Sequence, residues 1–280
     1  RHIAHVIHYD LSYIVQGAEH GPDGAIVLLH DFPSGAFAWD HIIPQLAGTN
    51  QAVYAIDMLG YGLSEFPWPS DTSIWGHADC LSMLFADLNL RNIVLVGHGL
   101  GGGVAQVLAT RLSRSRIKAL VLIDTIAYED TFAPNWPLPD MKKCQEPDQP
   151  HQISVEDMIK QLRETLPKGV HDDSRFNDDI LNDYTDQWNS DLGKEMLYQH
   201  IRLLLPNYSN AVASDLRLME KPTLIIWGED DQQMPLKLGQ RLHREIAQSE
   251  LVVIPGAGHM ILFDAVDQVA GAINDFVGKL

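Results

Sequence analysis

Residues 92–103 read Asn-Ile-Val-Leu-Val-Gly-His-Gly-Leu-Gly-Gly-Gly, an apolar β-rich run that ends directly in a glycine-rich turn. A helical pattern follows from Val104 to Leu112. A short buried strand that turns at once into a helix is typical of a parallel sheet with crossover helices. The glycines allow the strand and the helix to approach closely. The stretch therefore predicts a strand–turn–helix unit inside an α/β fold.

The same alternation of strands and helices extends to both sides of this unit. An opening antiparallel pair is expected at His2–His8 and Leu11–Val15, buried strands at Ala25–Leu29, Ala52–Ile56, Asn92–Val96, Lys118–Ile123, Thr223–Trp227 and Leu251–Ile254, and a closing amphipathic helix at Ile261–Val277. Strands that alternate with helices favour a parallel sheet covered on both faces. We expect a mostly parallel sheet of eight strands.

This rhythm breaks between residue 128 and about residue 215, where prolines cluster and helical patterns follow without a strong strand run. Residues 140–195 hold 14 acidic and 7 basic side chains. Such a charge excess is typical of a solvated outer face, with a role in substrate choice as the alternative. We expect residues 1–127 and 216–280 to form the core, and residues 128–215 to form an inserted helical cap.

Composition excludes several classes of function. The chain has 20 basic and 37 acidic residues, a formal net charge of −17, which opposes binding to nucleic acid or to an anionic membrane. No apolar run is long enough to span a bilayer. The two cysteines, Cys80 and Cys144, are too few for a disulfide framework, and we expect them to be free thiols in a reducing compartment. We expect a cytoplasmic protein, although the sequence begins at Arg1 and shows nothing of what precedes it.

Ligands of parallel α/β sheets bind beyond the carboxyl ends of the strands, so the loops there should be considered together. Those loops are residues 30–35, 57–64, 97–101, 228–231 and 255–259. In order and spacing they make the whole chain resemble an α/β hydrolase with a helical cap after its sixth strand. The resemblance implies a nucleophile, an acid and a histidine in that chain order, with the site under the cap.

The nucleophile position departs from that family. In that family the nucleophile lies on a sharp turn from strand to helix, the nucleophile elbow, whose sequence is Gly-x-nucleophile-x-Gly. Residues 97–101 keep the two flanking glycines but have Gly99 at the nucleophile position. Serine hydrolases carry serine here, whereas the dehalogenase and epoxide-hydrolase branches carry aspartate. Glycine has no side chain with which to attack a substrate.

The other expected parts of the machinery are present. His259 occupies the position of the family's general base, and Asp231 has the spacing of the acid that orients it, with Glu229 and Asp230 as alternatives. The backbone N–H groups of Phe32 and Leu100 would form the oxyanion hole, which needs no side chain at residue 99.

Asp31 is the second departure, because the family usually has glycine after the histidine of this loop. Its carboxylate either enters the space that Gly99 leaves or turns away to cap the loop. If it turns inward, burial would raise its pKa and His259 would lower it. Phe32-Pro33 with Trp39 resembles the HGxP loop of epoxide hydrolases and related dehalogenases, in which a cis peptide is common. Leu100, however, stands where those branches favour tryptophan.

Four aromatic residues are candidates for an apolar substrate pocket: Trp39, Tyr128, Trp136 and Trp188. Packing inside the cap or core is the alternative for each. We expect no cofactor and no metal, because the thirteen histidines have no metal-binding spacing. Gly97-x-Gly99-x-x-Gly102 fits a dinucleotide fingerprint only formally, since no acid follows at the ribose spacing.

Three functions remain open. The first is a hydrolase of a small apolar ester or lactone that acts by acyl transfer, with Gly99 as a serine-to-glycine inactivation. The second is a nucleophile-free lyase, isomerase or water-activating hydrolase that uses His259 and Asp31. The third is a non-catalytic protein that binds a small molecule on the hydrolase scaffold. The presence of both His259 and Asp231 argues against the third function, because a binding protein does not need this pair. The unusual Asp31 argues against a simple inactivation, which would leave the loop of residues 30–35 unchanged.

Overall fold

The computed structural model describes the chain except for residues 47–49, 68, 129–151, 173–175 and 205–209. Its centre is one sheet of eight strands in the order β1-β2-β4-β3-β5-β6-β7-β8. The strands are β1 (His2–Val6), β2 (Tyr9–Gln16), β3 (Ile26–Leu29), β4 (Val53–Ile56), β5 (Ile93–His98), β6 (Ile117–Ile123), β7 (Thr223–Gly228) and β8 (Ser249–Ile254). The β1–β2 and β2–β4 pairs are antiparallel and the remaining pairs are parallel. The predicted mostly parallel eight-stranded sheet is confirmed.

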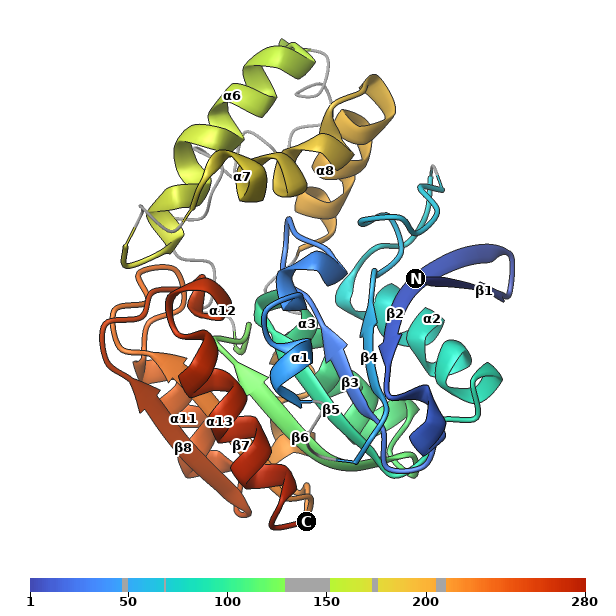
Figure 1. Ribbon diagram of the computed structural model, residues 1–280, viewed down its shortest axis with the longest axis vertical. Coiled ribbons are helices and arrows are strands. Elements are labelled where there is room, and N and C mark those ends of the chain that lie inside the picture. The colour runs from blue at the N-terminus through green and yellow to red at the C-terminus, as the bar shows by residue number, and fades with distance from the viewer. Residues whose placement is uncertain (47–49, 68, 129–151, 173–175, 205–209) are drawn as a thin grey trace.

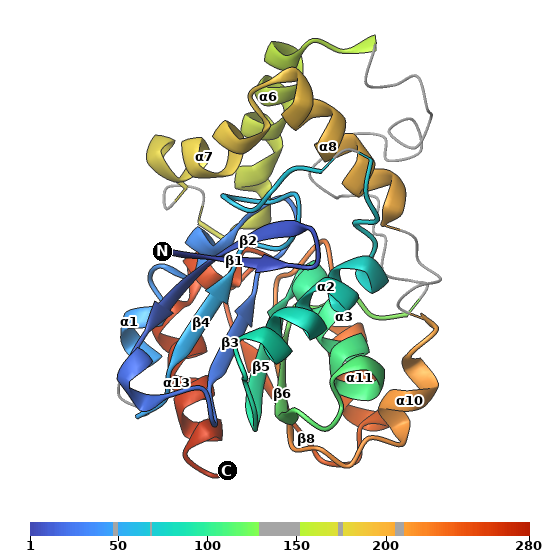
Figure 2. The same ribbon diagram turned by 90° about the vertical axis from the view of Figure 1, so that its right-hand side faces the viewer.

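Helices cover both faces of the sheet. In Figure 2, α1 (Ile43–Leu46) and α13 (Val266–Val277) lie on one face, and α2 (Ile74–Asp87), α3 (Gly99–Val107) and α11 (Lys237–Glu245) lie on the other. The central strands β3 and β5 are buried at every residue, as apolar strands covered on both sides should be. None of the described helices is long and apolar enough to cross a membrane.

Two of the predicted helices have different bounds in the structure. The helix after β5 already begins at Gly99, and it ends in a π-helical turn over Leu108–Leu112. The closing helix is two helices, α12 (Ile261–Asp264) and α13, because Ala265 leaves the helical backbone at φ −139° and ψ 46°. Apolar periodicity continues through such a break, so it could not be seen in the sequence.

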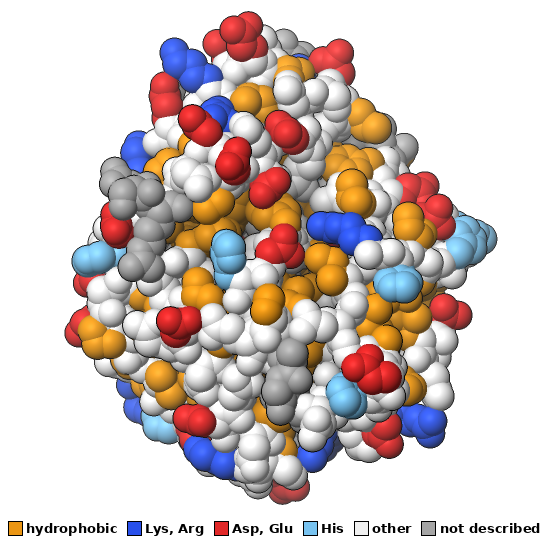
Figure 3. All heavy atoms as spheres, viewed as in Figure 1, with side chains coloured by type: hydrophobic (Ala, Val, Ile, Leu, Met, Phe, Trp, Pro, Cys, Tyr) orange, Lys and Arg blue, Asp and Glu red, His pale blue; other side chains and the backbone are white. Residues whose placement is uncertain are grey.

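Four α-helices separate β6 from β7 among the described residues: α6 (Val155–Thr165), α7 (Asp178–Thr185), α8 (Asp191–Leu203) and α10 (Ala213–Arg217). Side chains of Ser154, Asn177 and Ser190 cap the first three by accepting a backbone N–H. These three helices gather at one end of the molecule, and acidic side chains lie exposed over them (Figures 1 and 3). The predicted domain boundaries at residues 128 and 215 stay a prediction.

A small set of hydrogen bonds joins these helices to the loops of the core. The side chain of Gln187 donates to the carbonyl oxygen of Pro33 at 3.0 Å and accepts from the N–H of Gly62 at 2.8 Å. The indole N–H of Trp188 donates to the same Pro33 oxygen at 3.2 Å. Both residues follow α7 directly, so the inserted helices are fixed to the loops after β3 and β4.

The strand–turn–helix unit depends on close backbone packing at Gly101. A Cβ atom there would lie 2.3 Å from the carbonyl oxygen of Leu29, which belongs to rigid backbone. We expect Gly101→Ala to lower the free energy of unfolding by about 1–3 kcal/mol, because the helix must move off the sheet. Chemical denaturation measures this change.

Gly271 of α13 is the matched control for that experiment. No atom lies within 4 Å of a Cβ placed on it. Gly271→Ala should therefore stabilise the protein by up to about 1 kcal/mol through helix propensity. Equal effects of the two substitutions would contradict the close approach at Gly101.

Candidate active site

The turn between β5 and α3 places Gly99 at the carboxyl edge of the sheet. Its φ of +50° lies in the left-handed region, where glycine carries no steric cost. The carbonyl oxygen of Gly99 accepts the N–H of Ile126 at 3.1 Å, which ties the turn to the segment after β6. A Cβ atom on Gly99 would lie 2.0 Å from Oδ1 and 2.1 Å from Cγ of Asp31. The Asp31 carboxylate thus fills the place into which a nucleophile at residue 99 would project.

Asp31 follows β3, and its side chain points inward. Its Oδ1 accepts the N–H of Leu100 at 2.5 Å, and its Oδ2 lies 3.0 Å from Nε2 of His259. The side chain of Asp31 is buried, with 4% of the residue exposed. Of the two orientations left open for Asp31, the structure has the inward one. Phe32, the other predicted oxyanion donor, comes next in the chain, and the Phe32–Pro33 peptide is cis, as the loop resemblance implied.

His259 joins Asp31 to Asp231. Its Nδ1 lies 2.8 Å from Oδ2 of Asp231, and the other oxygen of that carboxylate accepts the backbone N–H groups of Gln233 and Met234 at 2.7 and 2.8 Å. Two backbone bonds and one imidazole bond therefore fix the Asp231 carboxylate. Of the three acids in this loop, Asp231 is the one that contacts His259.

Comparison with known proteins bears on this arrangement. A family model described as the alpha/beta hydrolase fold matches residues 24–266. The chain belongs to the α/β hydrolase fold family.

Its similarity to individual members of the family is modest in sequence and extensive in length. AB hydrolase superfamily protein YisY of Bacillus subtilis is 25% identical over 271 residues, which cover 95% of each chain. The 2-hydroxy-6-oxo-2,4-heptadienoate hydrolase of Pseudomonas putida is 24% identical and covers 92% of this chain and 90% of its own. The solved structure of the haloalkane dehalogenase DatA from Agrobacterium tumefaciens matches with a TM-score of 0.86 at 17% identity, over 99% of this chain and 96% of that one.

The charges of this α/β hydrolase site stabilise one another. Burial opposes a charge on His259, but the charges and hydrogen bonds of Asp231 and Asp31 raise its pKa well above 6.5. Burial likewise opposes ionisation of Asp31, but its hydrogen bond to His259 and the charge of that ring lower the pKa of the carboxyl. The surroundings therefore favour an imidazolium at His259 and a carboxylate at Asp31.

Asp124 is a buried acid that the sequence did not single out. It follows β6, where its Oδ1 accepts the N–H of Gly228 at 2.9 Å. Burial and the negative charge of Asp231 raise its pKa well above the ordinary value. The neutral form of Asp124 is therefore favoured by its surroundings. An aspartate after a buried strand is too common a pattern to have indicated this.

The predicted pocket aromatics have different locations. Trp39 and Trp188 are fully buried, and the indole N–H of Trp39 contacts no acceptor in the described part of the chain. Tyr128 packs against α11, where its hydroxyl donates to Glu245 and the guanidinium of Arg241 covers its ring. These contacts give no support for a pocket role of Tyr128. Trp136 lies outside the described residues.

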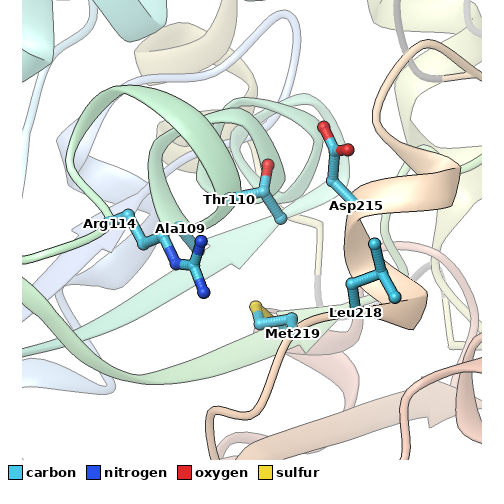
Figure 4. Close-up of a pocket in the computed structure, with 6 residues that line it drawn as sticks. All are labelled: Ala109, Thr110, Arg114, Asp215, Leu218 and Met219. Carbon is cyan, nitrogen blue, oxygen red and sulfur yellow. The ribbon is translucent and has the colours of Figure 1, made fainter.

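A cavity of about 350 Å³ reaches His259 from the side of the loops after β7 and β8. It is lined by Lys168, Gly169, Val170, His171, Asp230, Gln232, Gln233, Gly258 and His259. A second, smaller cavity of about 120 Å³ lies between the end of the α3 helix and α10 (Figure 4), and none of the predicted site residues lines it. The first cavity therefore borders His259, although only 1% of the His259 side chain is exposed.

Asp31, His98 and His259 also have the composition of a metal site, with one ligand atom each within 4.8 Å of the others. However, Nε2 of His98 contacts the carbonyl oxygen of His259 at 2.9 Å, and Nε2 of His259 contacts Asp31. A metal would have to replace these hydrogen bonds. The absence of a metal stays a prediction.

The ion pairs make stability dependent on pH. Because the folded-state pKa of His259 is raised, its contribution to stability is complete below pH 6.5 and is lost as the pH rises through the folded-state pKa. We expect Asp31→Asn to lower the folded-state pKa of His259. For each pKa unit of that decrease, the free energy of unfolding that is lost as the pH rises should be smaller by about 1.4 kcal/mol. Urea denaturation between about pH 6 and pH 10 measures both curves.

The control is Asp10→Asn, which removes the carboxylate from the exposed His5–Asp10 pair. Exposed pairs contribute little, so this variant should follow the wild-type curve. Identical curves for the wild type and Asp31→Asn would contradict the buried charge arrangement.

Proposed function

We propose that the protein hydrolyses a small molecule at an electrophilic sp³ carbon, an epoxide or an alkyl halide, through a covalent ester of Asp31. The observation that carries this proposal is the position of the Asp31 carboxylate in the volume above Gly99. There it meets Leu100 N–H on one side and His259 on the other, as a nucleophile on the elbow itself would.

The same position opposes acyl transfer to an ester or lactone. That reaction needs the Leu100 N–H for the negative oxygen of the substrate's tetrahedral intermediate. Oδ1 of Asp31 already accepts this N–H, and its negative charge would repel a second negative oxygen. A serine at residue 99 would in turn require the Asp31 carboxylate to leave. The geometry therefore favours a mechanism in which Asp31 is the nucleophile over one in which Gly99 replaces a lost serine nucleophile.

In the first step, Oδ2 of Asp31 forms a bond to the substrate carbon while the bond from that carbon to its leaving group breaks. A halide leaves as an anion. An epoxide oxygen must take up a proton, and the imidazolium of His259 holds one at Nε2, beside the reacting carboxylate. Oδ1 stays on Leu100 N–H throughout this step.

The second step follows from the change in charge. Once Asp31 is an ester it carries no charge, so the pKa of His259 falls because one of the two carboxylates that raise it is gone. With a halide, the imidazolium then releases its proton to solvent, whereas the epoxide has already removed it. Neutral His259 takes a proton from water, the water attacks Cγ of Asp31, and Leu100 N–H stabilises the negative Oδ1. Collapse breaks the bond from Cγ to the alkoxide, which takes the proton of the added hydroxyl and leaves as the alcohol, so that Asp31 is again a carboxylate and His259 an imidazolium.

Two similarities support this chemistry. The Phe32-Pro33 loop resembles that of epoxide hydrolases and related dehalogenases, and DatA, a haloalkane dehalogenase, shares the fold. Relatives named as hydrolases support hydrolysis more broadly.

Isotope labelling tests the ester directly. In a single turnover in water labelled with oxygen-18, with styrene oxide or 1-bromobutane as substrate, we expect oxygen-18 to appear in the Asp31 peptide. The product should carry unlabelled oxygen from the enzyme, because water attacks Cγ of Asp31 and not the substrate. Mass spectrometry of both molecules measures this, and the Asp231 peptide is the internal control.

His259→Gln should accumulate the alkylated Asp31 peptide, because the second step has lost its base. Labelled product with an unlabelled Asp31 would instead indicate direct water activation by the Asp31–His259 pair. No turnover of any substrate would favour the binding protein.

Moving the carboxylate back to the elbow provides a second test. We expect Asp31→Gly to lower turnover by about 10⁴-fold or more, since the nucleophile is lost. The double variant Asp31→Gly/Gly99→Asp should recover at least about a hundredfold of this loss. Aspartate tolerates the left-handed backbone, and the two residues share one volume.

The matched control is Asp31→Gly/Gly99→Asn, which restores the shape without the charge and should stay inactive. Equal rates in the two double variants would contradict a nucleophilic carboxylate at this place.

A further inference from the structure

A second group of buried polar side chains lies beside Asp31, and the reaction above does not use it. Tyr61 lies in the loop after β4, His77 on α2 and His200 on α8. The ring of Tyr61 stacks on His200 with centroids 4.0 Å apart, and His77 lies 5.7 Å from Tyr61 and 5.9 Å from His200. All three side chains are at most 1% exposed. We call these three residues the Tyr61 cluster.

Four polar atoms of the Tyr61 cluster have no hydrogen-bond partner among the described residues. They are Oη of Tyr61, Nδ1 and Nε2 of His77, and Nδ1 of His200. Buried polar groups are nearly always paired with protein, water or ligand, and an unpaired one costs free energy. Four such atoms on three touching rings therefore indicate a place that receives a polar group from outside the chain.

His30 shows what a satisfied histidine looks like in the same neighbourhood. Its Nδ1 donates to the carbonyl oxygen of Asp31 at 2.8 Å, and its Nε2 accepts the N–H of Met58 at 3.1 Å. Its ring contacts Tyr61 edge-on, with centroids 4.9 Å apart. The ring of His30 therefore contacts both the backbone of Asp31 and the Tyr61 cluster.

The chemistry of the missing partner follows from the free atoms. Burial lowers the pKa of His77 to about 3 and that of His200 well below 6.5, so both rings are neutral. Nε2 of His200 donates to the carbonyl oxygen of Gly60 at 3.0 Å, so its free Nδ1 carries a lone pair and needs a donor. Tyr61 offers an O–H that needs an acceptor. A hydroxyl group donates and accepts at once, whereas a carboxylate, a halide or an ether cannot donate.

We propose that the Tyr61 cluster is a subsite for a neutral hydroxyl group carried by the substrate, which accepts from Oη of Tyr61 and from one ring nitrogen of His77 and donates to Nδ1 of His200. This inference rests on the proposed function for the identity of the bound molecule as substrate. The subsite itself follows from the unpaired atoms. His200 lies on an inserted helix and Tyr61 and His77 on the core, so the bound hydroxyl bridges the two parts.

Matched ligand pairs test the subsite without turnover. The probes are primary alcohols of three to eight carbons and their methyl ethers, and calorimetry measures their Kd with the Asp31→Asn variant, which cannot form the ester. We expect at least one alcohol to bind about tenfold or more tightly than its ether, as one buried hydrogen bond provides. Tyr61→Phe and His77→Phe keep a ring in place, and each should reduce this ratio at least about threefold. Tyr13→Phe on β2 is the control and should leave it unchanged.

Three results would overturn the subsite: equal affinity for alcohols and ethers, no binding by any alcohol of the series, or a ratio that survives both cluster variants. A crystal structure with alcohol present that has a fixed water alone on the four atoms would overturn it as well. If either variant fails to fold, the other retains the test. If the protein prefers alcohols but no oxygen-18 appears in Asp31, the ester mechanism is rejected and the subsite is kept. If oxygen-18 appears in Asp31 but the protein does not prefer alcohols, the subsite is rejected and the ester mechanism is kept.

Discussion

The Asp31 carboxylate lies between two donors, the backbone N–H of Leu100 and the imidazolium of His259, in the space above Gly99. The other features of the site depend on this contact. It occupies the backbone N–H that a serine hydrolase keeps for its substrate, and together with Asp231 it raises the pKa of His259. Because the carboxylate is buried, its attraction to the imidazolium is little screened by solvent. Under the mechanism proposed above, a single side chain on the β3 loop supplies the nucleophile and also helps to hold the proton on His259.

Local sequence patterns were sufficient to predict the sheet and part of the candidate site. Apolar runs predicted each strand to within a few residues, because a strand covered on both faces must be apolar along its length. The positions of Asp231 and His259 followed from the loops after β7 and β8, since parallel strands bring their carboxyl ends to one edge. The break at Ala265 was missed because the apolar face continues through it.

The orientation of Asp31 and the Tyr61 cluster could not be derived in this way. Asp31 contacts Leu100 and His259, which lie 69 and 228 residues away in the chain. Its direction depends on the volume left by a glycine in another loop, and no pattern within the β3 loop carries that information. Tyr61, His77 and His200 come from a loop, a core helix and an inserted helix, so no spacing relates them. Nothing next to Tyr61, His77 or His200 in the sequence marks the residue as part of a site.

Residues 31 and 99 share one volume, and this couples their evolution. A chain that begins with a side chain on the elbow cannot gain aspartate at residue 31 without a collision, and a chain that first loses the elbow side chain has no nucleophile. Any route that changes one residue at a time therefore passes through an intermediate in which the two side chains collide or in which neither residue provides a nucleophile. The two substitutions should be epistatic, and classifying a hydrolase by its elbow residue alone will misjudge sequences in which the carboxylate has moved to the neighbouring strand.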